Sequence, residues 1–211
     1  MEKQPRIDLD FSDYQILFER VSGRIGHSEA EGKPVLAKFI STPIGILLAG
    51  ATEEGLCFLE FTEKERLELQ LPRLGKYFRS GIVLGESPIF SGLENQLYEY
   101  FKGKRKEFDT PLVTPGTEFQ QKVWKALASV PYGQTNSYEA QAIRVGDLQA
   151  IRAVAKANGE NRIAILIPCH RIIGKNGDLI GYGGGLWRKK FLLELERKNS
   201  DSPTLPFFPD E

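Results

Sequence analysis

Cysteine is scarce in this sequence of 211 residues, which contains only Cys57 and Cys169. Two thiols make no disulfide framework, so we expect both to be reduced. Apolar runs are short, none approaching the roughly 20 residues that span a bilayer, and the N-terminal Met-Glu-Lys-Gln-Pro has no signal-peptide character. We therefore expect a cytoplasmic protein. Its 41% hydrophobic content suffices for one large domain or two small ones.

Metal ligands are few as well. Structural zinc is held by four Cys or His side chains, and the chain offers only Cys57, Cys169, His27 and His170. A site that used all four, two of them adjacent in sequence, is implausible. We expect no metal and no other cofactor.

Net charge is zero, which by itself argues against a nucleic-acid partner. The average hides an asymmetry, because residues 111–198 carry 13 Lys/Arg and 7 Asp/Glu, a net +6, and the remainder carries −6. A basic segment beside an acidic one favours a polyanionic partner, and scattered solvated lysines are the alternative explanation.

The first 110 residues divide into a polar extension, residues 1–34, and an α/β segment, residues 35–110. In the extension Phe11, Tyr14, Phe18, Val21 and Ile25 recur at steps of three and four, which predicts one short amphipathic helix. Residues 35–40, 45–49 and 56–61 are apolar runs between turn signals and predict a β-meander. Residues 63–79 and 88–102 are predicted helices with a short strand between them. Two prolines in residues 109–116 indicate a linker.

Residues 111–198 are predicted to be mainly helical and are followed by a tail, residues 199–211. Thr117 is the expected N-cap of a first helix that ends before Pro131. Ser137 caps a helix over 138–145 with Gly146 as its stop, and Asp147 caps one over 148–158. Two short helices joined by a tight turn are typical of a helix-turn-helix. A last helix is expected over about 185–198.

The predicted helix 148–158 has one face that suits DNA. Gln149, Arg152, Ala153 and Lys156 follow one another at helical spacing and share that face. A face with a small residue at its middle and basic residues along its length fits close against a duplex, with Lys156 in contact with a phosphate. An ordinary solvent-exposed face is the competing interpretation.

Chemistry is concentrated in residues 163–173, where Cys169, His170 and Arg171 stand in strongly apolar surroundings. Neighbouring positive charge and an imidazole favour the thiolate, which is the nucleophilic form of cysteine. Cys57 has no ionisable neighbour within its apolar strand, so we expect it to be inert. A direct hydrogen bond between Cys169 and His170 is not required, since a water can bridge them.

Glu196 lies on or beside the apolar face of the last predicted helix. A carboxylate in that position needs a partner, and a catalytic imidazole would serve. A glutamate that reaches solvent near a helix end is an equally good interpretation.

Together these residues resemble the O6-alkylguanine-DNA alkyltransferase family, also called methylated-DNA–protein-cysteine methyltransferases. The similarity is dense over about residues 116–197. It runs through Gly116–Gln120, Val123–Leu127, Pro131–Tyr138, Arg152–Val154, Ala157-Asn158, Asn161, Ile167–Arg171 and Gly181–Gly185. Residues 35–110 resemble more loosely the family's N-terminal domain. The resemblance implies an α/β (α+β) fold, with a ribonuclease H-like domain followed by a helical domain that carries a helix-turn-helix.

The resemblance also implies a reaction. Cys169 accepts an alkyl group from guanine O6 in double-stranded DNA, in a single turnover that inactivates the protein. His170 acts as the base through a water and is oriented by Glu196. Asn161 braces the turn that carries Cys169, and Tyr138 helps to protonate the departing guanine. Thymine O4 is left open as a second substrate position, and a monomer is expected.

Recognition of DNA follows the same resemblance. Arg152 enters the base stack in place of the flipped nucleotide, and Ser137 with Tyr138 rotates the phosphate. The base pocket is formed by Tyr182, Gly183 and Ile172 together with Cys169.

The chain departs from the family pattern at two points that concern DNA and base recognition. Gly146-Asp147-Leu148 stands where the family has Gly-x-Pro, and Gly183 stands where some members have Ser. Three other functions compete with alkyl transfer: a non-catalytic alkyltransferase-like DNA binder, a cysteine hydrolase, and a helical binding module in which Cys169 is only structural. The binder lacks the acceptor cysteine that is present here, and turnover would distinguish the hydrolase.

Overall fold

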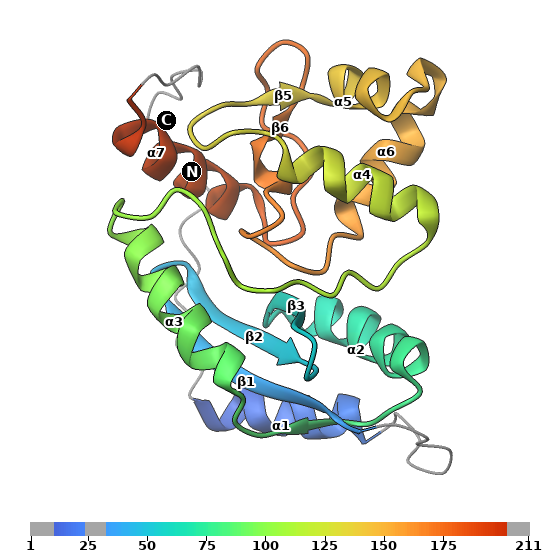
Figure 1. The fold of residues 1–211 in the computed structure, drawn as a ribbon, viewed down its shortest axis with the longest axis vertical. Coiled ribbons are helices and arrows are strands. Elements are labelled where there is room, and N and C mark those ends of the chain that lie inside the picture. The colour runs from blue at the N-terminus through green and yellow to red at the C-terminus, as the bar shows by residue number, and fades with distance from the viewer. Residues whose placement is uncertain (1–10, 24–32, 202–211) are drawn as a thin grey trace. The chain divides into compact units, whose positions relative to one another are not determined.

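The computed structural model describes residues 11–23 and 33–201, which form two compact units. The N-terminal unit contains the described residues up to Tyr98 and the segment 109–115. The C-terminal unit contains residues 99–108 and 116–201. Figure 1 labels the helices and strands of both units.

A four-stranded sheet forms the centre of the N-terminal unit. Strands β1 (Val35–Thr42), β2 (Gly45–Ala51) and β3 (Leu56–Phe61) pair antiparallel, as the meander prediction required. A short strand β4 (Ile82–Leu84) adds parallel to β1, giving the order β3-β2-β1-β4. Strands β2 and β3 are buried along their whole length, which explains their nearly continuous apolar sequence.

Helices α1 (Phe11–Ser22) and α2 (Lys64–Phe78) bury apolar residues in this unit. Phe18 and Val21 of α1 and Leu67, Leu71 and Leu74 of α2 belong to one core cluster with residues of all four strands. The amphipathic helix predicted near the N-terminus is therefore confirmed from Phe11, and Ile25 lies outside the described residues. Helix α3 (Pro88–Phe101) follows β4, and its last residues, from Glu99, belong to the C-terminal unit.

The predicted linker is not a free connection. Leu56 donates its backbone N–H to Pro111 at 2.8 Å, and Val113 donates to Leu56 at 2.8 Å, so residues 111–113 run alongside the start of β3. Proline blocks a regular strand here. A single β-bridge forms with Leu56, at a position that lies between Pro111 and Pro115 in the sequence.

The described part of the C-terminal unit contains, besides the end of α3, the helices α4 (Glu118–Ala128), α5 (Tyr138–Val145), α6 (Ile151–Gly159) and α7 (Leu186–Asn199). Thr117 caps α4 in a capping box with Gln120, and Ser137 caps α5 by accepting from the N–H of Ala140. Gly146 ends α5 with φ 97°, a left-handed conformation that favours glycine. Helices α4, α5 and α6 contact one another, so the helix-turn-helix is packed on α4.

The predicted continuous helix over 148–158 is wrong in its first turn. Leu148–Ala150 form one turn of 3-10 helix, and α6 begins only at Ile151. Asp147 accepts from the N–H of Gln149 at 2.8 Å, two residues ahead. A cap bonded at this short spacing favours the tighter turn, and such turns are common where a helix begins.

Strands β5 (Asn136–Ser137) and β6 (Ile172–Ile173) pair in parallel, and Cys169–Arg171 form a 3-10 turn, η3, directly before β6. Among the described residues no helix is long and apolar enough to cross a membrane.

Candidate active site

Cys169 stands at the end of a buried loop that Asn161 organises. Asn161 accepts from the N–H of Ile163 at 3.1 Å and donates through Nδ2 to the carbonyl of Ile167 at 2.8 Å. The same Nδ2 lies 3.2 Å from Cys169 Sγ, and an N–H directed at sulfur stabilises the thiolate. Ile165 in this loop has φ 70°, a strained conformation for a β-branched residue. The loop is thus held in a shape that presents the sulfur.

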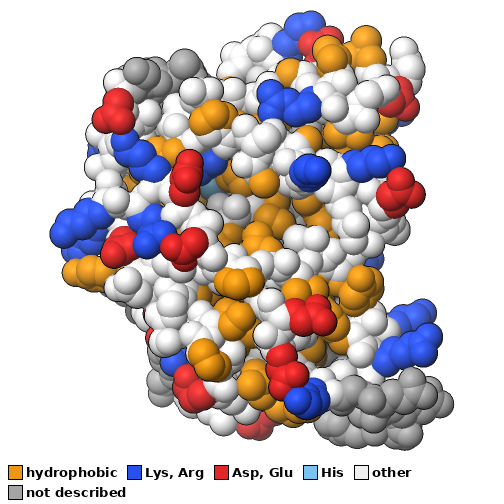
Figure 2. Space-filling model, in the orientation of Figure 1, with side chains coloured by type: hydrophobic (Ala, Val, Ile, Leu, Met, Phe, Trp, Pro, Cys, Tyr) orange, Lys and Arg blue, Asp and Glu red, His pale blue; other side chains and the backbone are white. Residues whose placement is uncertain are grey.

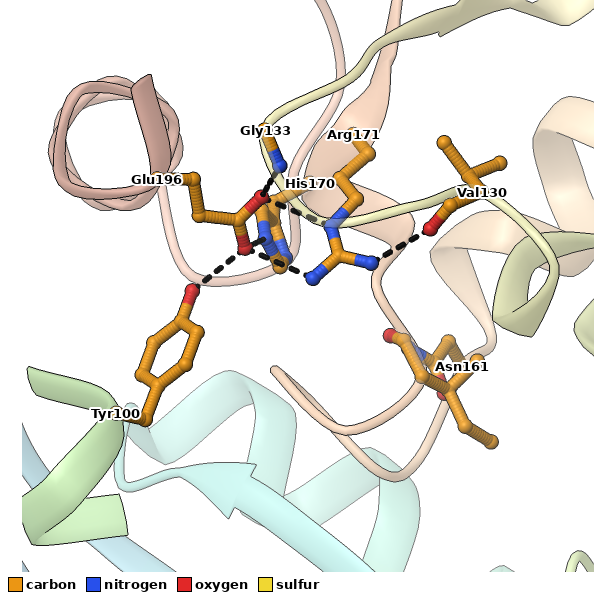
Figure 3. A network of polar contacts seen from close by, with 8 residues as sticks. Tyr100, Val130, Gly133, Asn161, His170, Arg171 and Glu196 are labelled. Carbon is orange, nitrogen blue, oxygen red and sulfur yellow. Dashed lines mark hydrogen bonds and ion pairs between the residues drawn. The ribbon is translucent and has the colours of Figure 1, made fainter. Parts of the chain in front are cut away.

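His170, the next residue, is completely buried and bonds to helix α7. Its Nε2 lies 2.8 Å from Glu196 Oε1 (Figure 3). Burial lowers the pKa of His170 below its usual range, against the opposing effect of Glu196. Of the two interpretations of Glu196 left open by the sequence, the structure therefore has the paired, buried carboxylate.

Glu196 accepts hydrogen bonds from three further residues besides His170. Arg171 donates from Nε to Oε2 at 2.9 Å and from Nη2 to Oε1 at 3.0 Å, a bidentate ion pair (Figure 3). Tyr100 donates its hydroxyl to Oε1 at 2.7 Å, and Gly133 donates its N–H to Oε2 at 3.2 Å. Burial acts to raise the pKa of Glu196, but the charge and hydrogen bonds of His170 and Arg171 outweigh it and lower the pKa to about 2.

This network fixes the tautomer of His170. Because Glu196 is ionised and can only accept, the proton of the neutral imidazole lies on Nε2. Nδ1 is then the unprotonated nitrogen, and it is buried without a hydrogen-bond partner among the described residues. The ring can therefore take up a proton at Nδ1 while Glu196 stabilises the resulting charge.

We expect Glu196→Gln to remove a pH dependence of stability. The folded-state pKa of about 2 lies below the ordinary 4.5, so the carboxylate stabilises the fold above pH 4.5, and this stabilisation is lost as the pH falls through 2. The shift corresponds to roughly 3 kcal/mol of the free energy of unfolding. Urea unfolding at about pH 5 and about pH 2.5 measures the loss.

Glu194→Gln is the matched control, since Glu194 is a partly exposed residue of the same helix. It should retain the wild-type decrease in stability between the two pH values, whereas Glu196→Gln should be less stable at pH 7 and show a smaller decrease. Equal acid slopes for wild type and Glu196→Gln would contradict the assignment.

A small cavity of about 190 Å³ opens beside Cys169. Its lining comes from α5, α6, the 3-10 turn η3 and the loop before α7: Tyr138, Ala155, Asn158, Gly159, Cys169, Gly181, Tyr182 and Gly183. Tyr138 donates to the carbonyl of Ile180 at 3.3 Å, and burial, followed by the charge of Cys169, raises its pKa. The phenol therefore stays protonated beside the sulfur.

A more open groove of about 530 Å³ continues from this cavity and shares Tyr138, Ala155 and Gly181 with it. Arg152 and Ser137, both expected to bind DNA, also line the groove. Gln149, Ala153 and Lys156 are exposed on the 3-10 turn and on α6. Arg152 thus lines the groove that adjoins the cavity with Cys169, and the DNA-binding role of all these residues stays a prediction.

Lys189 on α7 forms hydrogen bonds with the loop that lines one side of the cavity. It is completely buried, and its Nζ donates to the carbonyls of Ile172 at 2.5 Å and Ile180 at 2.6 Å, with Gly181 at 3.3 Å. Burial lowers the pKa of Lys189 to about 8, against the opposing charge of Cys169. An ammonium held by three carbonyls fixes the loop that carries Gly181 and Tyr182.

Comparisons with known proteins agree with this architecture. The family model described as 6-O-methylguanine DNA methyltransferase, DNA binding domain, matches residues 118–198, and the model of the ribonuclease-like domain of that enzyme matches residues 35–114. A methylated-DNA–protein-cysteine methyltransferase of Methanosarcina barkeri is 44% identical over 163 residues, which cover 76% of this chain and 96% of the relative. The chain belongs to the methylated-DNA–protein-cysteine methyltransferase family.

Other members of the family extend the comparison. The protein of the same name from Mycobacterium bovis is 55% identical over 111 residues, 53% of this chain and 67% of its own. The crystal structure of Mycobacterium tuberculosis OGT in complex with DNA has 43% identity and a TM-score of 0.67, covering 81% of this chain and 96% of that one. An O6-methylguanine-DNA methyltransferase from Pyrococcus kodakaraensis, at 20% identity and a TM-score of 0.58, shares the fold.

One expectation drawn from the family resemblance stays a prediction, and one drawn from the sequence needs correction. Ile172, expected to help form the base pocket, is completely buried in β6, where its carbonyl accepts from Lys189. The guanidinium of Arg171, expected to act as positive charge next to Cys169, instead bonds Glu196 and the carbonyl of Val130 at 2.6 Å. In the 3-10 turn, consecutive side chains point in different directions, so adjacency in sequence did not give contact in space.

Sequence reasoning missed Tyr100, Gly133 and Lys189 in this member of the family. Tyr100 lies 96 residues before Glu196, and nothing in its helical context distinguishes it. Lys189 stands between Arg188 and Lys190, a run typical of a solvated surface. Gly133 entered the sequence analysis only as part of the segment Pro131–Tyr138, although its φ of 73° is a left-handed conformation and its N–H reaches Glu196.

Surface charge on the C-terminal unit is mixed. In the view of Figure 2, Lys and Arg side chains lie over α4, α5 and α6 among acidic and apolar ones. Part of the net +6 of residues 111–198 is internal, because Arg162, Arg171, Arg188 and Lys189 are buried.

Proposed function

We propose that the protein repairs DNA by transferring a methyl or other alkyl group from guanine O6 to Cys169, once per chain. The observation that carries the proposal is the arrangement around the sulfur. Cys169 borders a cavity of about 190 Å³, and the neighbouring His170 has its unprotonated Nδ1 buried while Nε2 bonds the ionised Glu196. Family membership supports the same activity.

The reaction begins with loss of the thiol proton. It passes through a water to Nδ1 of His170, and Glu196 stabilises the imidazolium that forms. The thiolate attacks the alkyl carbon, a carbon–sulfur bond forms, and the electron pair of the broken carbon–oxygen bond stays on guanine. Tyr138, kept neutral by its raised pKa, is placed to supply a proton to the leaving base. A thioether is stable, so the protein is consumed.

Asn161 holds the sulfur in place for this attack. Its hydrogen bonds to Ile167 and to Cys169 fix the loop and favour the thiolate. Tyr182 and Gly183 line the cavity and are proposed to contact the base, with Gly183 leaving more room than a serine would.

DNA is the partner, and the damaged base must leave the duplex before it can reach Cys169. Unstacking a base costs a few kcal/mol, less for a poorly paired one. Arg152 is proposed to fill the vacated position from the groove next to the cavity, with Ser137 and Tyr138 on the rotated phosphate. Lys156, Gln149 and Ala153 complete the surface against the backbone. A monomeric, cytoplasmic protein stays a prediction, as does activity on thymine O4.

Intact mass after incubation with DNA that contains O6-methylguanine tests the proposal. A mass increase of one methyl group per chain, reaching one equivalent and then stopping, is the expected result. Unmodified protein together with demethylated DNA would instead indicate turnover, as in a hydrolase. Unmodified protein and unchanged DNA would leave only DNA binding.

Binding of undamaged DNA should be weakly sequence-specific and sensitive to salt. Repair has to work in any sequence, and the exposed Lys156 and the net +6 of residues 111–198 favour contacts to phosphate. Affinity should fall at least about tenfold between about 50 and 200 mM salt, because phosphate contacts release counterions. Fluorescence anisotropy with two unrelated duplexes measures both properties, and an affinity independent of salt would contradict the expectation.

A further inference from the structure

Tyr100 shares one carboxylate oxygen with the imidazole of His170. Oε1 of Glu196 accepts from Tyr100 Oη at 2.7 Å, from His170 Nε2 at 2.8 Å and from Arg171 Nη2 at 3.0 Å (Figure 3). We infer that Tyr100 sets the proton affinity of His170, by competing with its Nε2–H for Oε1 of Glu196. The inference rests on the proposed function in one respect, namely that His170 takes the proton of Cys169.

Orientation of the carboxylate does not depend on Tyr100. Arg171 donates two parallel N–H groups, one to each carboxylate oxygen of Glu196. The backbone N–H of Gly133 also donates to the carboxylate, at Oε2. A bidentate guanidinium fixes the plane of a carboxylate by itself. What the hydroxyl of Tyr100 adds is a neutral donor that takes part of the negative charge on Oε1.

The direction of the effect follows from this sharing. Each donor to a carboxylate weakens the bonds that the same oxygen makes to other donors. Without the hydroxyl, Oε1 would bind the Nε2–H of His170 more strongly and stabilise the imidazolium better, so Nδ1 would become more basic. Tyr100 is thus a positioning residue that acts through Glu196 and lowers the basicity of His170.

The other charged and titratable groups near His170 differ from Tyr100 in what their removal would change. They are Glu196 and Lys189 on α7, Arg171 and Cys169 on η3, and the phenol of Tyr182, while the phenol of Tyr132 lies beside Tyr100 and Arg171. Removing Glu196, Lys189 or Arg171 would change the net charge of the buried site. Replacing Tyr100 by Phe leaves the charge unchanged and keeps the ring contacts with Phe101 and Phe108.

Tyr132 provides a matched control. Its ring centroid lies 6.0 Å from that of Tyr100, and its buried hydroxyl has no hydrogen-bond partner among the described residues. Burial raises the pKa of Tyr132 to about 12, so the phenol is uncharged at neutral pH. Tyr132→Phe therefore removes a neighbouring hydroxyl without removing a hydrogen bond.

The proton resonance of His170 Nε2–H is the decisive measurement. The chain has two histidines, so full-length protein with His27→Gln has His170 as its sole imidazole. A stronger bond to Oε1 moves this buried proton downfield, so we expect a downfield shift in Tyr100→Phe and none in Tyr132→Phe. An unchanged or upfield resonance in Tyr100→Phe would overturn the inference, whatever the repair rates are.

The reaction of each variant with free O6-benzylguanine supplies the functional readout. The rising limb of the rate against pH reports the unprotonated form of His170, so it should move to higher pH by about half a unit in Tyr100→Phe, which is a roughly threefold slower reaction at a fixed pH on that limb. Tyr132→Phe should keep the wild-type profile. If the resonance shifts but no variant, wild type included, is alkylated, the proposed function fails and the effect of Tyr100 on His170 stands.

Discussion

Cys169→Ser should remain unmethylated after incubation with DNA that contains O6-methylguanine, whereas the wild-type chain gains one methyl group. The serine hydroxyl keeps its proton under conditions where a thiol becomes a nucleophilic anion, so neither His170 nor Asn161 can activate it to the same extent. DNA binding should persist, because the exposed face of α6 is unchanged. Peptide mapping by mass spectrometry, with a binding assay on the same samples, measures both results.

Cys57→Ser is the control for this experiment and should retain full transfer. Cys57 is completely buried in β3, and its thiol donates to the carbonyl of Gly50 at 3.3 Å. Burial raises the pKa of the Cys57 thiol to about 12, which keeps it protonated and unreactive. A methyl group found on Cys57, or transfer by Cys169→Ser, would remove the basis for the proposed acceptor.

The same pair of variants separates alkyl transfer from hydrolysis. Glu196, His170 and Cys169 form a series of acid, imidazole and thiol that also occurs in hydrolases. A hydrolase regenerates its thiol, so wild-type protein would process many equivalents of substrate and stay unmodified. Modification that stops at one equivalent and is lost in Cys169→Ser is expected only of a stoichiometric acceptor.

Local sequence predicted the elements of this fold well where local forces decide. The strand over 56–61 and the caps Thr117 and Ser137 were predicted and found, because turn signals and side-chain hydrogen bonds act within a few residues. The first turn at Leu148 was missed, since the choice between 3-10 and α-helix there depends on a single cap geometry.

The candidate site was predicted only in part, for a different physical reason. Cys169, His170 and Asn161 lie within nine residues of one another, and Glu196 was suggested by its place on an apolar helix face. The remaining members of the network are brought together by tertiary structure. Tyr100 comes from a helix far away in sequence, and Arg171 is turned from Cys169 toward Glu196 by a tight turn. Such contacts depend on the fold and carry no local signal.

The other large effect concerns Arg152, which should matter for base flipping and not for chemistry. Arg152 is exposed on α6 and lines the groove that leads to the cavity, and the small Ala153 beside it leaves room for a duplex. Arg152→Ala should slow repair of O6-methylguanine in duplex DNA by roughly 30-fold or more, equivalent to the few kcal/mol that an unstacked base costs. Reaction with free O6-benzylguanine, which needs no flipping, should change less than about twofold. Single-turnover rates on both substrates measure the difference.

Lys156→Ala is the matched control, because Lys156 is also basic and exposed on α6 but does not line the groove. It should weaken DNA binding while leaving the repair rate at saturating duplex close to that of wild type. His170→Ala and Glu196→Ala should slow both substrates, since both residues act on the thiol. If Arg152→Ala slowed the free base as much as the duplex, Arg152 would be shaping the cavity itself. If it slowed neither, another side chain would have to fill the position that the flipped base leaves.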